Sequence, residues 1–361
     1  MCILTQLKIL KVPISRPIRQ LIMSPREDFL AIVTSNTVHV AVLPDSSHLS
    51  LKDTSPLNLK TYHIGPTTHV LERAPIASAI WHPLASSGGC LVTVTVDAVV
   101  RLWELDKDNR WSFDSPALAV DLRKLVNGHS SAEDFSPSKY GANKGFSPDS
   151  FEMEVASACF GGSAVEGEDP WAAMTLWIAM REGDVYGLCP LLPSKWLARP
   201  SMIIELSETI ACSTSSDPSS GYSQRTRNQL QTWATDLASQ ESSLEGESSY
   251  SERLVMQRPL RPNAIPKLQG PFMISPEIDD MFDVTDIYAI PAINNDEADP
   301  SEDGEIADEL EPSAASLLCL ATADGKVHVL TGAGAVEGRW LPTRKVMKPL
   351  SRSPYSSADL A

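Results

Sequence analysis

The chain has 361 residues, 42% of them hydrophobic, which is enough to bury the core of one large domain or several small ones. Its formal net charge is −16, and nine of the acids lie in residues 296–311, a stretch without Lys or Arg. Removing those nine acids still leaves a net charge of −7. A protein of that sign repels phosphate, so the composition argues against direct binding to nucleic acid.

The cysteines and the apolar stretches indicate a soluble protein of a reducing compartment. No two of the six cysteines form a CxxC pair, which favours free thiols over disulfides. The longest apolar stretch, residues 90–100, is shorter than the roughly 20 residues of a membrane helix and contains Asp97. Lys8 and Lys11 interrupt what would be the core of a signal peptide. We therefore expect a cytosolic or nuclear protein with no membrane insertion.

Two copies of one pattern occupy the first third of the chain. In each copy an apolar stretch ends in a Pro turn, and two β-rich runs follow, separated by a tight polar turn. Met23-Ser24-Pro25 in the first copy and Trp81-His82-Pro83 in the second superpose in register. The β-rich runs are residues 29–34 and 38–43 in the first copy, and residues 90–96 and 99–105 in the second.

Two further hairpins follow later in the chain. Gly183 and Gly325 lie in their turns and supply the positive φ angles that tight hairpins require. The paired runs are residues 174–180 and 185–188 in the third hairpin, and residues 317–321 and 327–330 in the fourth.

Hairpins of this kind, each too small to bury its faces alone, are typical of propeller blades. The run at residues 90–96 is nearly continuously apolar, as expected for an inner strand covered on both faces. Leu102-Trp103-Glu104 resembles the end of a WD repeat, although the first two Pro turns are 58 residues apart, which implies insertions. A β-sandwich fits each hairpin locally but not the repeated register. We predict an all-β protein with a β-propeller fold.

Several segments interrupt or follow the β pattern. We assign residues 1–341 to the propeller and residues 342–361 to a disordered tail. Within the propeller, residues 125–150 are predicted to form a loop, residues 201–257 a partly helical insertion, and residues 292–313 an acidic disordered linker.

The insertion contains two predicted helices. Ser201 can cap the N-terminus of the first helix. The helical period places four apolar residues on one face of it: Met202, Ile203, Leu206 and Ile210. The second, from about Thr226, carries a narrow apolar stripe. This stripe either packs on the propeller or anchors a partner protein in the way that helices bind grooves. Its members, our candidate protein-interaction residues, are Leu230, Trp233 and Leu237.

The sequence contains no clear motif for catalysis, metal binding or cofactor binding. The seven histidines have no metal-ligand spacing, and a hydrogen-bonded structural role is expected for His39 and His328. Gly161-Gly162-Ser163 lacks the last glycine of a nucleophile elbow, and the glycines of residues 332–338 fit an inter-blade turn better than a dinucleotide loop. We therefore expect no catalytic residues, no metal and no cofactor.

Three strings of residues carry a resemblance to a known family. They run from Asp184 to Trp196, from Gln269 to Phe272 with Thr285-Asp286-Ile287, and from Leu320 to Val327 with residues 336–340. In this order and spacing the chain resembles the fungal eighty-two-kilodalton nucleoporin family, which is related to the animal eighty-eight-kilodalton nucleoporin, over about residues 18–341.

The resemblance implies a seven-bladed propeller that acts as a scaffold on the cytoplasmic side of the nuclear pore complex, in the nuclear envelope. Its implied partners are other nucleoporins: the C-terminal tail of one on the cytoplasmic side, and the C-terminal domain of a Gly-Leu-Phe-Gly nucleoporin. The complex would support mRNA export and nucleocytoplasmic transport.

In the family a coiled coil follows the propeller, whereas this sequence accounts for about five blades and ends without heptads. An unrelated WD-like adaptor in RNA processing or ubiquitin transfer, or a propeller enzyme, is the alternative.

Overall fold

The computed structural model describes residues 8–44, 55–86, 89–126, 153–163, 165–214, 223–241, 243–245, 253–272, 283–292, 316–331 and 336–341. Of the predicted loop at 125–150, only the first two residues belong to the described part, as the end of a short helix. Residues 293–313 of the predicted linker, and the tail at 342–361, lie outside it.

The described residues form five antiparallel sheets, of which four follow one another along the chain with their strands paired largely in sequence order, while the fifth lies in the insertion described below. The first contains β2 (Gln20–Met23), β3 (Phe29–Val33), β4 (Val38–Val42) and β6 (Thr61–Ile64). The second contains β7 (Ile76–Trp81), β8 (Cys90–Thr95), β9 (Val99–Glu104) and β10 (Leu118–Asp121). The third contains β11 (Val155–Phe160), β12 (Leu176–Met180), β13 (Val185–Leu188) and β17 (Leu268–Phe272). The fourth contains β18 (Val284–Ile290), β19 (Leu317–Thr322) and β20 (Val327–Thr331).

The remaining elements are insertions and short connections. A parallel pair of β1 (Leu10–Lys11) and β5 (Leu57–Asn58) precedes and flanks the first sheet. The 3-10 helix η1 (Arg110–Phe113) and the helix α2 (Leu122–Val126) flank β10, and η3 (Ala172–Met174) precedes β12. Between β13 and β17 lie β14 (Lys195–Ala198), α3 (Pro200–Thr214), α4 (Gln224–Ala238), β15 (Ser243–Glu245) and β16 (Arg253–Gln257).

All four predicted hairpins are confirmed: β3–β4, β8–β9, β12–β13 and β19–β20 pair as antiparallel neighbours. Gly183 and Gly325 adopt φ angles of 104° and 84° in their turns, as the turn chemistry predicts. The turn of the second hairpin instead uses Ala98, at φ 63°. The described residues contain four sheets that follow one another along the chain and a further three-stranded antiparallel sheet, β14-β16-β15, so the expectation of about five blades stays a prediction.

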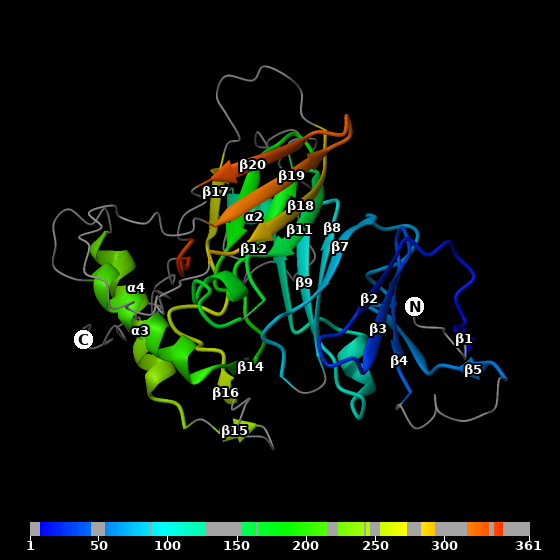
Figure 1. Ribbon diagram of the computed structural model, residues 1–361, viewed down its shortest axis with the longest axis horizontal. Helices are drawn as coiled ribbons and strands as arrows, with labels where there is room; N and C mark the ends of the chain where they lie inside the picture. The colour runs from blue at the N-terminus through cyan, green and yellow to red at the C-terminus, as the bar shows by residue number, and fades with distance from the viewer. Residues whose placement is uncertain are drawn as a thin grey trace, which may run out of the picture.

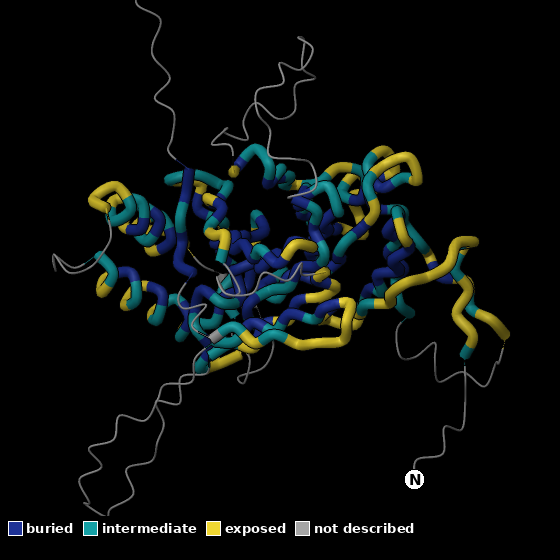
Figure 2. The backbone as a smooth tube through the Cα atoms, turned by 90° about the horizontal axis from the view of Figure 1, so that it is seen from above, coloured by how far each residue is buried: buried dark blue, intermediate teal, exposed yellow. Residues whose placement is uncertain are grey.

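The sheets lie side by side in chain order, with the first strand of one sheet against strands of the next (Figure 1). Seen from above, the buried residues concentrate between the sheets, and the segment around β1 and β5 is largely exposed (Figure 2). This arrangement of twisted meanders is that of propeller blades.

A repeated polar contact links the first strands of three successive sheets. Ser78 of β7 and Ser157 of β11 lie with their hydroxyl oxygens 3.2 Å apart, and the Ser157 hydroxyl donates to the Asp286 carboxylate of β18 at 2.6 Å. Each of the three follows a register shift in its own strand. The bulge therefore aims an equivalent side chain at the neighbouring sheet in each blade.

The inner strand β8 is buried on both faces, as predicted for residues 90–96. Leu91 packs in the cluster shared with the first sheet, and Val94 in the cluster shared with the third. Both side chains are 0% exposed, which confirms the prediction that they lie in the interior of the second blade.

Two buried histidines connect neighbouring sheets in their neutral form. His82 Nδ1 accepts the backbone N–H of Leu84, so its Nε2 must donate to the Leu191 carbonyl at 2.8 Å. His69 Nε2 lies 3.0 Å from the Thr93 hydroxyl, which also accepts the indole N–H of Trp103. Burial lowers the pKa of His82 to about 4, and burial with the nearby Arg101 and His63 lowers the pKa of His69 to about 3.

We expect acidification to weaken the fold through these two groups. Their pKa values are lower in the folded than in the unfolded chain, so their stabilising effect is complete above about pH 6.5 and decreases as the pH falls toward the folded values. At pH 5 each should lower the free energy of unfolding by about 2 kcal/mol. Urea unfolding at pH 7 and pH 5 measures this loss. His82→Gln should remove about half of the pH dependence that these two histidines cause, and equal free energies at both pH values would contradict the prediction.

Candidate protein-interaction site

The predicted apolar stripe lies on α4, which begins at the N-cap Ser223, whose side chain accepts the Thr226 N–H. Leu230, Trp233 and Leu237 are 0%, 1% and 3% exposed. They belong to the same buried cluster as Met202, Leu206 and Ile210 of α3, so the two helices bury their apolar faces together. In α3, Pro200 is the first helical residue and Ser201 lies inside the helix, so the predicted Ser201 cap is wrong; proline is favoured at this first position because its φ is already helical.

Trp233 lies at the centre of a ladder of three tryptophans. Its ring centroid is 5.3 Å from that of Trp171, which precedes η3, and 5.9 Å from that of Trp340 near the end of the described chain. All three are at most 3% exposed. Gly338 fits between two of these rings, because a Cβ there would lie 2.7 Å from Trp340 and 2.9 Å from Trp171. The glycine is therefore required by close packing.

Residues 336–341 form hydrogen bonds both to the α3–α4 hairpin and to β17 of the third sheet. The side-chain amide of Gln229 on α4 donates to the Trp340 carbonyl at 3.3 Å, and the Ser213 hydroxyl on α3 donates to the buried Glu337 carboxylate at 2.8 Å. On the sheet side, Gln269 of β17 donates to the Glu337 carbonyl at 2.9 Å. A segment far away in sequence thus completes the core of the insertion.

The stripe is therefore part of the interior in this chain, which is the arrangement that the packing alternative predicts. A role of Leu230, Trp233 and Leu237 in binding a partner stays a prediction. What α4 presents to solvent is polar: a shallow groove of about 450 Å³ is lined by Asn228, Gln231, Thr232, Thr235 and Arg261.

Two aliphatic residues of the insertion face solvent and were not singled out from the sequence. Ile204 on α3 is 59% exposed, and Leu260, which follows β16, is 72% exposed. Leu260 lies between two prolines, Pro259 and Pro262, which is a local signal for a rigid, projecting turn. Exposed apolar side chains on such turns suit protein contacts.

The outer face of the fourth sheet is a second apolar surface. In the strand register Tyr288 pairs with Cys319, and Cys319 pairs with Val329, so these three side chains share one face of the sheet. Ile290 and Val327 lie two residues from Tyr288 and Val329 on the same strands, so their side chains are on that face too. Tyr288, Val327 and Val329 are each more than half exposed. Among the described strands, β20 pairs with β19.

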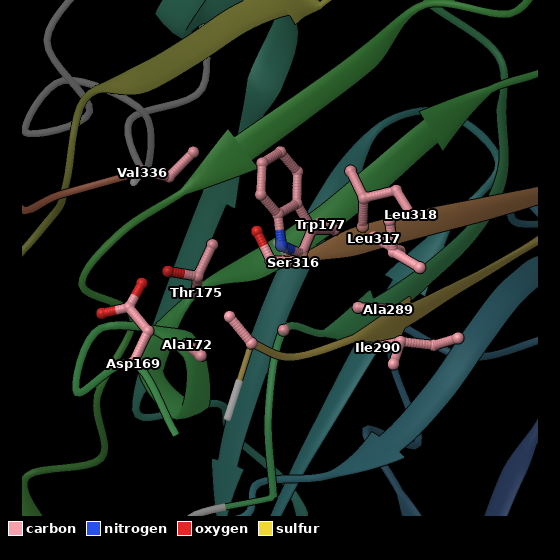
Figure 3. A pocket seen from close by; sticks show the side chains of 12 residues that line it. Asp169, Ala172, Thr175, Trp177, Ala289, Ile290, Ser316, Leu317, Leu318 and Val336 are labelled. Carbon is pink, nitrogen blue, oxygen red and sulfur yellow. The ribbon is translucent and has the colours of Figure 1, made fainter. Parts of the chain in front are cut away.

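The junction of the third and fourth sheets holds a small cavity (Figure 3). Its lining includes Asp169, Thr175 and Trp177 on one side and Leu317 on the other, and its volume is about 30 Å³. That is room for about one water molecule, whereas small-molecule sites in proteins usually measure about 300–1,000 Å³.

The described residues contain no group of three His, Cys, Asp or Glu side chains placed to hold a metal ion. Five of the six cysteines are described, and all five are free thiols, as predicted. The structural role expected for His39 is confirmed by its 3.1 Å contact with the Thr37 hydroxyl and by stacking on His63. No helix in the described ranges is both long and apolar enough to span a bilayer.

Comparisons with known proteins agree with this architecture. The family model described as the nucleoporin NUP82 beta-propeller matches residues 4–360. The nucleoporin NUP82 of Chaetomium thermophilum is 44% identical over 367 residues, which cover 98% of this chain and 41% of that protein. The chain therefore spans about two fifths of the length of this relative.

Solved structures give the same result. The crystal structure of the Chaetomium thermophilum heterotrimeric Nup82 NTD-Nup159 TAIL-Nup145N APD complex matches with a TM-score of 0.76 and 42% identity, over 95% of this chain and 62% of that one. The yeast heterotrimeric Nup82-Nup159-Nup116 complex matches over 89% of this chain and 61% of that one, with a TM-score of 0.55 and 15% identity, which supports the fold alone. The predicted propeller fold and family are both confirmed: the chain belongs to the NUP82 beta-propeller family of nucleoporins.

Proposed function

We propose that the chain is the propeller of a non-enzymatic scaffold nucleoporin on the cytoplasmic side of the nuclear pore complex. There it binds other nucleoporins and supports mRNA export and nucleocytoplasmic transport. The observation that carries the proposal is the match to a solved relative, 42% identical, whose structure is a complex with a Nup159 tail and a Nup145N domain. By this likeness, the equivalents of those two segments are the partners of this chain.

The chemistry of the described residues supports a binding role over catalysis. The cavity between the third and fourth sheets has room for about one water molecule, and no group of His, Cys, Asp or Glu placed to hold a metal ion occurs among the described residues, including those that line the larger clefts. Exposed apolar side chains occur instead on the insertion and on the fourth sheet. Such surfaces are typical of proteins that bind other proteins.

The binding role is tested by reconstitution. The purified chain is mixed with the Nup159 tail and the Nup145N APD of Chaetomium thermophilum and analysed by size-exclusion chromatography. We expect co-elution of all three. Separate elution of both segments would contradict the proposal and favour an unrelated WD-like adaptor. One equivalent of zinc in elemental analysis of the purified chain would contradict its non-enzymatic part.

The exposed face of the insertion is the part of this surface that we assign to the Nup145N-type domain. Ile204→Asp with Leu260→Asp should weaken its capture at least tenfold in a titration, because exposed aliphatic anchors are lost. The melting temperature should stay within about two degrees, since exposed substitutions cost at most about 0.5 kcal/mol. Leu71→Asp, which makes the same kind of change at an exposed side chain outside the insertion, is the control. Unchanged capture would remove the insertion from the interface.

A further inference from the structure

One tryptophan differs from the other seven in its surroundings. Trp111 is 77% exposed, whereas every other tryptophan in the chain is at most 6% exposed. Tryptophan is the residue type most enriched among the strongest contributors to protein–protein binding. An exposed one on a rigid element therefore points to a contact site.

The element that carries Trp111 is held firmly in place. It belongs to η1, where the Asn109 side chain accepts the Trp111 N–H at 3.2 Å. The Ser112 hydroxyl accepts the Asp106 N–H and donates to the Asn109 carbonyl, which closes the turn on itself. Phe113 is buried, with its ring 4.1 Å from that of Tyr62, and its carbonyl accepts the Gly65 N–H. The side chain of Trp111 is thus presented from a preordered turn.

Residues of this turn, which we call the ridge (Asp106–Asp114), line two clefts, while the Trp111 side chain lies outside both linings. The first, about 520 Å³, includes Arg110, Lys107 and Lys60 in its lining, together with Tyr62 and Asp114. The second, about 680 Å³, includes Asn109 and Ser112 from the other side of the turn. The turn contacts β6 of the first sheet and β9 of the second.

The first cleft has a small excess of positive charge, although the protein as a whole is acidic. Its lining contains three basic residues, Lys60, Lys107 and Arg110, and two acidic residues, Asp108 and Asp114. The whole chain, by contrast, carries a net charge of −16. The Lys60 ammonium lies 5.1 Å from the Tyr62 ring centroid, and Lys107 forms an ion pair with Asp28 at 3.1 Å. No ion pair of Arg110 occurs with any residue of the described ranges. A ligand of opposite charge is therefore favoured here.

We propose that this ridge and the cation-lined cleft bind a short acidic peptide segment of a partner protein. Carboxylates of the peptide pair with Arg110 and Lys60, and an aliphatic or aromatic side chain packs on Trp111. A nucleic acid strand would use similar groups, but it presents a long continuous row of phosphates, for which this cleft supplies three cations. The site is separate from the insertion and independent of the scaffold function proposed above.

The test uses a fluorescein-labelled peptide with the sequence of residues 296–311, which combines nine acids with the aliphatic residues Ile306 and Leu310. Binding is followed by fluorescence anisotropy on the full chain. It is repeated on a full chain whose own nine acids are changed to Asn and Gln, because the covalently attached segment would compete. A peptide with the same nine changes is the control ligand.

We expect the acidic peptide to bind and its affinity to fall with added salt. Trp111→Ala should weaken binding at least tenfold, and Lys60→Glu with Arg110→Glu should do the same. Arg225→Glu, an equally exposed charge reversal on α4, should change affinity by less than about twofold. Absence of binding to both forms of the chain would overturn the proposal, as would an equal loss in Arg225→Glu. Tighter, Trp111-dependent binding of a single-stranded oligonucleotide would overturn it in favour of a nucleic-acid site.

Discussion

Replacing Leu230, Trp233 and Leu237 together by Ala should detach the α3–α4 hairpin from the third sheet. All three side chains are at most 3% exposed, and Trp233 contacts both Trp171 and Trp340. Truncation costs about 2–5 kcal/mol for a buried leucine and about 3–5 kcal/mol for a buried tryptophan, because a cavity remains. Together these losses are comparable to the whole stability of a typical domain, about 5–15 kcal/mol.

The loss should be visible as local unfolding before global unfolding. We expect rapid proteolytic cleavage within the insertion, a smaller helical signal in far-UV circular dichroism, and a lower melting temperature. Gln231→Ala with Thr235→Ala, on the exposed face of the same helix, should leave all three measurements nearly unchanged. A triple variant with unaltered stability but weakened capture of the Nup145N-type domain would show that these residues act as partner anchors.

The sequence was sufficient to locate the hairpins because each depends on local chemistry. Glycine at a positive φ, polar turn residues and short apolar runs lie next to one another in the chain, so Gly183 and Gly325 could be assigned without tertiary information. The same holds for α4, where the 3.6-residue period grouped Leu230, Trp233 and Leu237 on one apolar face. The period left open whether that face packs on the propeller or binds a partner, and it did not show that Trp171 and Trp340 surround Trp233.

Features that depend on distant segments could not be predicted. The hydrogen-bonded link of Ser78, Ser157 and Asp286 joins three blades, and its sequence signal is weak: Ile-Ala-Ser, Val-Ala-Ser and Val-Thr-Asp at irregular spacing. Composition also could not separate exposed Trp111 from the buried tryptophans, since the surroundings of a side chain are set by packing. The exposed residues of the candidate site were the hardest to predict. The local sequence around Ile204 and Leu260 carries no signal that their side chains face solvent.

Leu91→Asp should prevent stable folding of the second blade. In β8, Leu91 is 0% exposed and is flanked in register by Trp81 on β7 and Trp103 on β9. The substitution removes about 2 kcal/mol of hydrophobic burial and places a carboxyl group among indole rings, where an unpaired polar group costs about 2–7 kcal/mol more. Its cluster extends to Phe29 of the first sheet, so the damage should spread to both sheets.

Urea unfolding followed by tryptophan fluorescence measures the effect, and two matched variants identify its cause. Leu91→Ala leaves a cavity without a charge and should lose about 2–5 kcal/mol, less than Leu91→Asp. Leu71→Asp makes the same chemical change at a side chain that is 47% exposed, and it should change the free energy of unfolding by no more than about 0.5 kcal/mol. If Leu91→Asp unfolded like the unsubstituted chain, β8 would not be an inner strand covered on both faces. The order of the blades would then have to be revised, because that strand joins the core of the first two sheets to the core of the third.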